Sequence, residues 1–150
     1  MAKSPVNHIM VLVDGTEQAF HAAERAIDLA RMLGARLTAM AVVDTATLRQ
    51  LLSVRILVDA EMSEFEKELQ ESARRHLVSV RGRALDQHLV IEEILVTGNV
   101  EDIVPRIVHE RQIDLIAIGG FESHRAQRDL VARQRQQIVD RATCPVLVVK

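Results

Sequence analysis

The chain has 150 residues, enough for one domain with its own hydrophobic core. Hydrophobic residues make up 48%, charged residues 27%, and the net charge is −2. This composition argues against a disordered chain and against a basic surface that attracts nucleic acid.

Two further classes of partner are disfavoured by the residues that are missing. The chain has no Trp, no Tyr and three Phe, so aromatic platforms for stacking nucleic-acid bases are nearly absent. No apolar run approaches the ~20 residues of a membrane helix, and the first residues lack a signal-peptide core. We therefore expect one domain over residues 1–150, located in the cytoplasm, with no nucleic-acid or membrane partner.

Cysteine and histidine give no sign of a metal site. Cys144 is the single cysteine, so no internal disulfide can form, and no Cys/His pair has zinc spacing. We expect Cys144 to be a small residue at the start of a strand and the scattered histidines to be ordinary surface or hydrogen-bonded residues.

Short apolar runs alternate with segments of helical period along the chain. Each run is bounded by turn residues, which is typical of strands buried on both faces. The predicted strands are 9–13, 37–43, 90–96, 113–118 and 145–149.

The first predicted helix follows the first strand. Thr16 can cap its start, and Gly34 can end it. Its apolar stripe consists of Ala19, Ala23, Ala26, Ile27, Ala30 and Leu33.

A long stretch from 45 to 81 without Gly or Pro comes next. Its second half has helical period, and we expect Gly82 to end that helix; it could cover a dimer or partner surface. Segment 45–60 is either helix or loop.

Two further helices complete the pattern. Asn99 can cap the third, in which Pro105 should kink the helix or push its regular part downstream. The last helix has its apolar residues at Leu130, Val131, Ile138, Val139 and Ala142.

Alternating strands and helices are typical of an α/β fold with a doubly wound parallel sheet covered on both faces. Ligands bind such Rossmann-like sheets outside the carboxyl ends of the strands, where the strand order reverses. The candidate site segments are 14–16, 43–44, 97–99 and 119–135.

Known catalytic and cofactor motifs are missing from these segments. Neither G-x-G-x-x-G nor G-x-x-x-x-G-K-[ST] occurs, and no Ser/His/Asp or Cys/His arrangement stands out. We therefore assign no catalytic residue and expect no enzyme.

Five features occur in order along the chain: IMVLVDGT at 9–16, ARMLGARL at 30–37, Gly98 before the third helix, DLIAIG at 114–119 and CPVLVV at 144–149. Together, and in this order, they resemble the universal stress protein family across essentially the whole chain. The resemblance implies a five-stranded sheet of order 3-2-1-4-5 and a homodimer formed by the last strands. The expected interface residues are Val146, Leu147, Val148 and Val149.

Many members of that family bind ATP through a Gly, two residues, Gly, nine residues, Gly and then Ser or Thr. Here Gly119 matches the first position, but the others fall on Glu122, Ala132 and Arg133. A carboxylate near the phosphates costs on the order of one to a few kcal/mol. We therefore expect a stress-response or interaction module that binds no ATP in the family manner and has no cofactor.

The alternative is a member that binds ATP, ADP or AMP with Mg, and slow ATP hydrolysis is the enzymatic alternative that goes with it. The loop and helix after the fourth strand contain His124 and four arginines, Arg125, Arg128, Arg133 and Arg135. These arginines either bind phosphate or form a solvated face paired with Glu122 and Asp129. The candidate nucleotide-binding residues, several of them implied by the resemblance, are Asp14, Gly15, Val42, Gly98, Asn99, Gly119, Arg125 and Arg133.

Overall fold

The computed structural model describes residues 5–45, 49, 53, 59–120 and 130–150. Its elements are β1 (His8–Leu12), α1 (Glu17–Leu33), β2 (Arg36–Asp44), α3 (Asp59–Asp86), β3 (Glu92–Gly98), α4 (Val100–Glu110), β4 (Leu115–Gly119), α5 (Leu130–Arg141) and β5 (Val146–Val149). The five strands pair in parallel in the order β3-β2-β1-β4-β5. The predicted α/β class and strand order are therefore confirmed.

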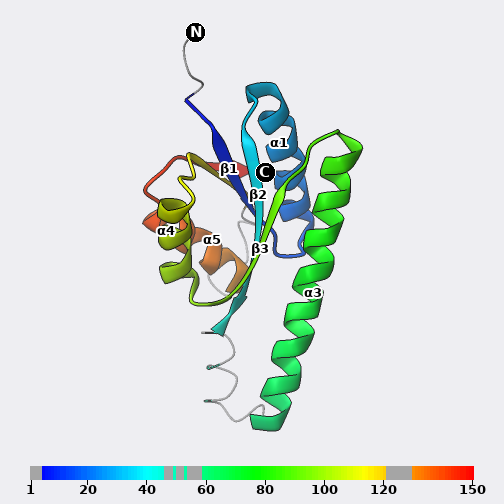
Figure 1. The fold of residues 1–150 in the computed structure, drawn as a ribbon. Coiled ribbons are helices and arrows are strands. Elements are labelled where there is room, and N and C mark those ends of the chain that lie inside the picture. Colours follow the sequence, from blue (N-terminus) through cyan, green and yellow to red (C-terminus); the bar gives the residue numbers. More distant parts are fainter. Residues whose placement is uncertain (1–4, 46–48, 50–52, 54–58, 121–129) are drawn as a thin grey trace.

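Helices cover both faces of the sheet (Figure 1). α1 and α3 pack on one face, where β1 contributes Ile9 and Val11 to the core. α4 and α5 cover the other face, to which the same strand contributes Met10 and Leu12. Since successive side chains of a strand point to opposite faces, the continuous apolar run of β1 serves two cores.

The caps predicted for α1 are present. The Thr16 hydroxyl accepts a hydrogen bond from the Ala19 amide at 3.1 Å, and Gly34 ends the helix with φ of 64°. The predicted stripe is buried from Ala19 to Ala30, but Leu33 is 39% exposed. Leu33 is the last residue of the helix.

α3 differs from its prediction because it does not end at Gly82. The helix continues to Asp86 and turns at His88, which has φ of 61°. Leu77, Val80 and Ala84 are buried on both sides of the glycine, so tertiary packing outweighs the low helix propensity of glycine. The helix-or-loop prediction for 45–60 falls mostly on residues outside the described part of the chain.

β3 and α4 correct two further predictions. β3 begins at Glu92 rather than at Val90, which is 83% exposed. α4 begins at Val100, directly after its predicted cap Asn99, so Pro105 does not push the helix downstream. Burial of five apolar residues holds the helix against the sheet despite the missing proline amide: Val100, Ile103, Val104, Ile107 and Val108.

The remaining boundaries lie within one or two residues of the predicted ones. β1 and β4 are shifted by one or two positions, β2 is longer by one residue at each end, and β5 starts after Pro145. α5 is present, with Ile138 buried in the second core. Among the described residues, no helix is long and apolar enough to cross a membrane.

Candidate functional site

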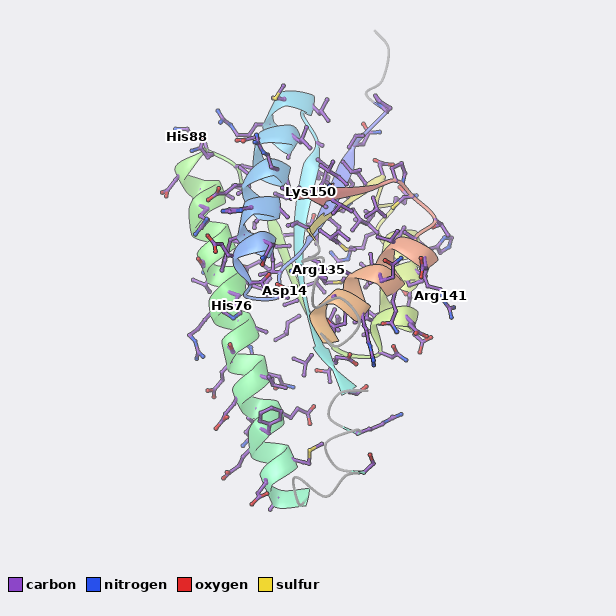
Figure 2. The ribbon with its side chains drawn as sticks, turned by 180° about the vertical axis from the view of Figure 1, so that it is seen from behind. Asp14, His76, His88, Arg135, Arg141 and Lys150 are labelled. Carbon is purple, nitrogen blue, oxygen red and sulfur yellow. The ribbon has the colours of Figure 1, made fainter. Side chains whose placement is uncertain are left out.

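The candidate site lies at the carboxyl edge of the sheet, where β1 and β2 lead into Asp14 and Asp44. Seen from behind, Asp14 and Arg135 lie between the α1–α3 layer and α5, with His76 of α3 beside them (Figure 2). This is the position at which doubly wound sheets bind ligands.

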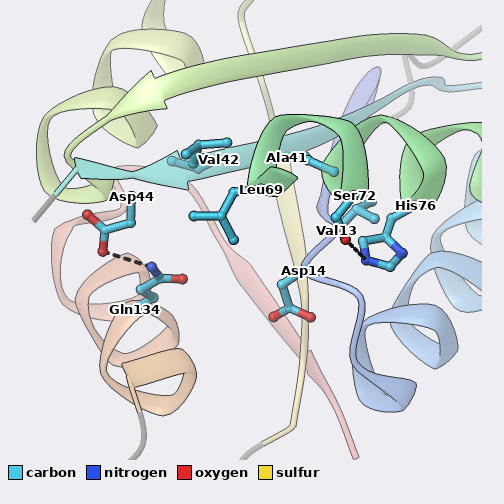
Figure 3. Close-up of a pocket in the computed structure, with 11 residues that line it drawn as sticks. Val13, Asp14, Ala41, Val42, Asp44, Leu69, Ser72, His76 and Gln134 are labelled. Atoms are coloured by element: carbon cyan, nitrogen blue, oxygen red, sulfur yellow. Dashed lines mark hydrogen bonds between the residues drawn. The ribbon is translucent and has the colours of Figure 1, made fainter. Parts of the chain in front are cut away.

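A pocket of about 280 Å³ opens at this edge between the sheet and α3. Its middle is apolar and its two ends are polar: Asp44 and Gln134 lie at one end, and Asp14, Ser72 and His76 at the other (Figure 3). The remaining described lining residues are Val13, Ala41, Val42, Val43, Leu69 and Ala73. The volume is close to the lower bound of about 300 Å³ for ligand pockets, so a small ligand fits it best.

At one end of the pocket, α5 is tied to β2. The Gln134 side-chain amide donates to Asp44 Oδ2 at 2.8 Å. The end of β2 is thereby fixed relative to α5.

At the other end, the ring of His76 is held in place by its neighbours. Nε2 lies 3.2 Å from the Ser72 hydroxyl one turn earlier in α3. A Cβ on Gly15 would lie 2.5 Å from the same nitrogen, and Gly15 has φ of 82°. Glycine is therefore required at position 15 for both its backbone conformation and the close approach of His76.

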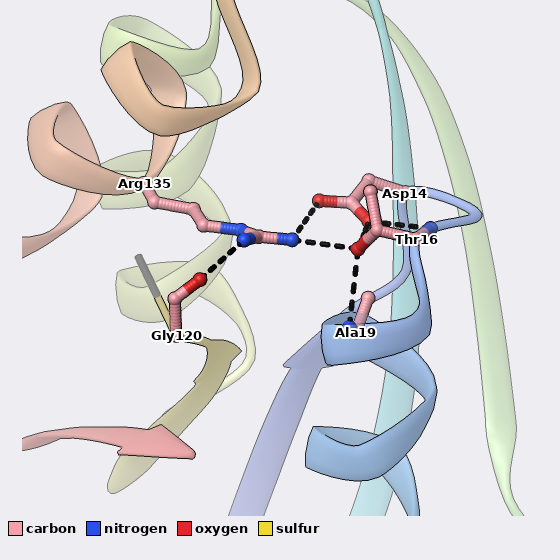
Figure 4. Close-up of polar contacts among 5 residues, drawn as sticks. All are labelled: Asp14, Thr16, Ala19, Gly120 and Arg135. Carbon is pink, nitrogen blue, oxygen red and sulfur yellow. Dashed lines mark hydrogen bonds and ion pairs between the residues drawn. The ribbon is translucent and has the colours of Figure 1, made fainter. Parts of the chain in front are cut away.

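Arg135 lies beside the pocket and contacts Asp14, one of the lining residues (Figure 4). Its side chain is buried, and Nη2 donates to Asp14 Oδ2 at 2.9 Å and to Thr16 Oγ1 at 2.7 Å. Nη1 donates to the Gly120 carbonyl at 2.6 Å. Nε has no hydrogen-bond partner within the described part of the structure. One guanidinium thus joins the turn after β1, the end of β4 and α5.

The Asp14 carboxylate is used by the fold itself. Oδ1 accepts from the Thr16 amide at 3.0 Å and from the Thr16 hydroxyl at 2.6 Å, while Oδ2 accepts from Arg135. A carboxylate has about four acceptor positions, so these described partners take three of them. Asp14 therefore caps a turn and neutralises a guanidinium.

The sequence-predicted residues divide into two groups. Asp14 and Val42 line the pocket, and Gly15 lies directly behind it against His76. Gly98 and Asn99 do not line the pocket, and the Asn99 side chain caps α4 by accepting from the Glu101 amide at 3.1 Å.

The motif residues after β4 are also spread out. A Cβ on Gly119 would lie 2.8 Å from the backbone carbon of Gln18, so this glycine lets β4 pack against the start of α1. Ala132 is buried and Arg133 is exposed. Arg125 and Glu122 lie outside the described residues.

Sequence reasoning missed the residues that α3 and α5 bring to the site. Arg135 was noted only as one of several arginines, although its spacing of three residues from Ala132 and from Ile138 places it on the buried face of α5. In α3, Ser72 lies three residues after Leu69, and His76 lies three residues after Ala73, so both are in phase with the apolar stripe of the helix. The pattern does not show what these side chains or Gln134 contact, because that depends on how the helices pack.

The described residues give no sign of reactive cysteine or metal chemistry. Burial raises the pKa of the Cys144 thiol, which disfavours the thiolate needed for nucleophilic attack. Within the described ranges, no group of three His, Cys, Asp or Glu side chains is placed to hold a metal ion.

Comparisons with known proteins agree on one family. A family model described as the universal stress protein family matches residues 5–150. A Staphylococcus aureus protein assigned to the universal stress proteins is 31% identical over 144 residues, which cover 95% of this chain and 83% of that protein.

Solved structures of the family share the fold. Universal stress protein UspA from Lactobacillus plantarum is similar over 100% of both chains, with a TM-score of 0.77 and 23% sequence identity. The universal stress protein from Archaeoglobus fulgidus in complex with dAMP has a TM-score of 0.62 and 17% identity, over 97% of this chain and 98% of that chain.

Proposed function

Because this chain belongs to the universal stress protein family, we propose that it is a cytoplasmic, homodimeric stress-response module that acts through protein contacts. In this proposal it binds no ATP in the family manner and catalyses no reaction. The single observation that carries the proposal is the buried guanidinium of Arg135 paired with Asp14.

Arg135 supports the proposal because its guanidinium lies where the strand order of the sheet reverses and is already paired with a carboxylate of the protein itself. The ion-paired side chains are 5% and 13% exposed, and the guanidinium already has three oxygen partners. A phosphate would have to compete with Asp14 for this cation in a site that is shielded from water.

The sequence after β4 supports the same conclusion. Phosphate loops use glycines so that backbone amides converge on the anion. This chain has Glu122 and Ala132 at the two later glycine positions of the family motif and Arg133 at the hydroxyl position. Gly119, which does match, is explained by its packing against α1.

The homodimer is proposed from the edge strand β5. Among the described strands it pairs only with β4, and all four of its residues are partly exposed. An apolar strand with an unpaired edge gains backbone hydrogen bonds and buried area by pairing with a second copy.

Titration calorimetry with Mg-ATP on protein purified without added nucleotide tests the absence of ATP binding. We expect no heat of binding at millimolar ATP and no nucleotide carried through purification. Because the chain has no Trp or Tyr, absorbance at 260 nm reports a bound nucleotide with little protein background. Stoichiometric binding at micromolar ATP would overturn the proposal.

A second candidate function is nucleotide binding through the pocket. It is favoured by the pocket's place at the ends of β1 and β2 and by the dAMP held by the Archaeoglobus fulgidus structure. In that case AMP or ATP with Mg would raise the melting temperature, and Asp14→Asn would reduce the increase. An unchanged melting temperature at millimolar nucleotide rejects this candidate.

A further inference from the structure

We propose that the outer edge of β3 accepts an added β-strand from a partner protein, and that this segment carries acidic side chains on the face turned toward α3. The inference rests on the proposed function, because it names the surface through which such a module contacts another protein. The surface is separate from the pocket and lies at the opposite edge of the sheet from β5.

The strand β3 forms one edge of the sheet and lies in front of β2 in Figure 1, between α3 and α4. Among the described strands it pairs only with β2, over its whole length from Glu92 to Gly98. Apart from these sheet bonds, no described backbone hydrogen bond involves its residues. Every second residue of an edge strand directs its amide and carbonyl groups outward, so β3 presents a row of groups that a further strand can pair with.

The middle of β3 lacks the features that commonly protect an edge strand. Such edges carry Lys, Pro, a bulge or inward-pointing charges. The charges of β3 stand at its first two residues, residues 94–97 are Ile, Leu, Val and Thr, and the register with β2 is unbroken. Apolar and β-branched side chains favour strand pairing. An added strand therefore meets a stretch that is suited to backbone hydrogen bonding.

A row of basic side chains on α3 flanks this edge. Lys67, Arg74 and Arg81 follow one another at intervals of seven residues, so they lie on one side of the helix. Arg81 Nη1 lies 3.2 Å from Glu93 Oε2, which places that side of α3 beside β3. Arg74 is about 10 Å further along the helix, the length of about three strand residues, and α3 and β3 run in opposite directions (Figure 1). Arg74 therefore lies alongside the middle of the strand.

Charge favours an acidic segment over a second copy at this edge. Lys67 and Arg74 are exposed and form no ion pair with a described residue. A second copy joined antiparallel at β3 would bring both α3 helices to one face of the enlarged sheet, where their basic rows would repel each other.

An acidic segment gains both cations as partners instead. Every second side chain of an added strand points to the face that α3 covers, so alternate acidic residues reach Lys67 and Arg74. Exposed ion pairs contribute little each. The backbone hydrogen bonds therefore supply most of the affinity, and the charges select the partner.

The test is fluorescence anisotropy at low salt, with the whole protein and three labelled, capped peptides as long as β3. Glu and Val alternate in the first peptide, Lys replaces Glu in the second, and Pro replaces the central Val of the first peptide in the third. We expect the Glu/Val peptide to bind and the other two to bind at least tenfold more weakly. The proline peptide fails because it lacks an amide that the added strand donates to β3.

A matched pair of variants tests the position of the charge. Arg74→Glu reverses the charge beside β3, whereas Arg75→Glu makes the same change at an exposed position about 100° further round the helix. We expect Arg74→Glu to weaken binding of the Glu/Val peptide at least threefold and to strengthen binding of the Lys/Val peptide. Arg75→Glu should leave both affinities unchanged, with circular dichroism confirming that both variants fold.

Hydrogen exchange locates the bound peptide. We expect the Glu/Val peptide to slow the exchange of outward-facing amides within 92–98 and to leave 146–149 unchanged. Slower exchange in 146–149 alone would place the peptide on β5 and overturn the inference. Outward amides of β3 that dimerisation already protects without peptide would also overturn it, since a second copy then occupies the edge.

The remaining outcomes separate this inference from the proposed function. No binding of the Glu/Val peptide, equal binding of the Lys/Val or proline peptide, or equal losses in the two α3 variants overturns the inference while ATP independence stands. Micromolar ATP binding overturns the proposed function, and selective binding of the Glu/Val peptide at β3 then still supports the docking edge.

Discussion

Arg135 and Asp14 are 121 residues apart in the chain, and their side chains form an ion pair with 2.9 Å between Nη2 and Oδ2. The neighbouring residue Gln134 makes a similar contact with Asp44 at 2.8 Å. Two consecutive residues of α5 thus hold the acidic residues at the ends of β1 and β2. The placement of α5 on the sheet therefore depends on the same groups that define the candidate site.

We expect Arg135→Met to destabilise the protein strongly. The substitution leaves Asp14 nearly buried without its cation, and breaking a buried pair by removing one partner costs about 3–5 kcal/mol. Urea unfolding followed by far-UV circular dichroism measures the loss in the free energy of unfolding.

Two controls make this result specific. Arg133→Met makes the same change at an exposed position of α5 and should alter stability by less than about 1 kcal/mol. The double variant Asp14→Asn with Arg135→Met removes both charges and should recover part of the loss. An Arg135→Met protein as stable as the wild type would show that the pair contributes nothing.

Gly82 and Gly34 should respond oppositely to alanine. Gly82 lies inside α3 with nothing within 4 Å of an added Cβ, so Gly82→Ala should stabilise by about 0.5–1 kcal/mol. Gly34 has equal space but φ of 64°, which costs alanine roughly 1 kcal/mol. Thermal melts of the two variants should shift in opposite directions, and a lower melting temperature for Gly82→Ala would contradict the continuous helix.

These two glycines also show which predictions from sequence hold. Gly34 ends a helix because the apolar pattern stops there and the glycine adopts the left-handed backbone conformation of a helix C-cap. Gly82 does not, since Val80 and Ala84 are buried on both sides of it and long-range packing decides. Strand positions and the caps at Thr16 and Asn99 were predicted because they depend on local pattern. The sheet order was predicted from the resemblance to the family, because connection rules alone leave more than one topology.

The candidate site could be predicted only in part for the same reason. Asp14 and Asp44 follow from strand ends, which the pattern locates, whereas Val42 was predicted from the resemblance to the family. The partner of Asp14 lies at the far end of the chain, and His76 reaches the pocket only because α3 packs beside α1. The helical phase of His76 in α3 and of Arg135 in α5 indicates that both face inward, but it does not identify the residues that they contact.

Gly119→Ala should destabilise the fold whether or not any nucleotide binds. The added Cβ would lie 2.8 Å from the Gln18 carbonyl carbon and 2.9 Å from the Ala19 amide nitrogen, both backbone atoms that cannot move independently. Overpacking of this kind costs typically about 1–3 kcal/mol. The urea midpoint of Gly119→Ala, compared with that of Gly82→Ala, measures the loss in the free energy of unfolding. An unchanged midpoint would contradict the packing role of Gly119 and favour a role in ligand binding.

We expect His8 to make the free energy of unfolding depend on pH between about 5 and 7, around the ordinary pKa of histidine. Its Nδ1 donates to the Arg111 carbonyl at 2.9 Å, so Nε2 is unprotonated and accepts from the Thr38 hydroxyl at 2.7 Å. Burial lowers the pKa of His8 below 6.5, partly offset by its hydrogen bond to Arg111.

The sign follows from proton uptake. The unfolded chain takes up a proton at His8 near its ordinary pKa, while the folded chain stays neutral to lower pH. The free energy of unfolding therefore falls as pH drops below about 6.5, by at most about 1.4 kcal/mol per pH unit. Urea unfolding at several pH values should show this slope in wild type and in the exposed-site control His21→Gln, but a smaller slope in His8→Gln. Equal slopes in all three proteins would refute the assignment.

The last prediction concerns the edge strand β5. If two copies pair through β5, a charge at Leu147 would be buried unpaired beside the partner's strand, where desolvation disfavours it. Light scattering coupled to size-exclusion chromatography should give twice the chain mass of 16.8 kDa for the wild type and the single chain mass for Leu147→Asp. Val90→Asp places the same charge on an exposed apolar residue before β3 and should leave the dimer intact. Because β3 and β5 are the two edges of the sheet, a dimer lost in Val90→Asp but kept in Leu147→Asp would move the interface to the opposite side of the molecule.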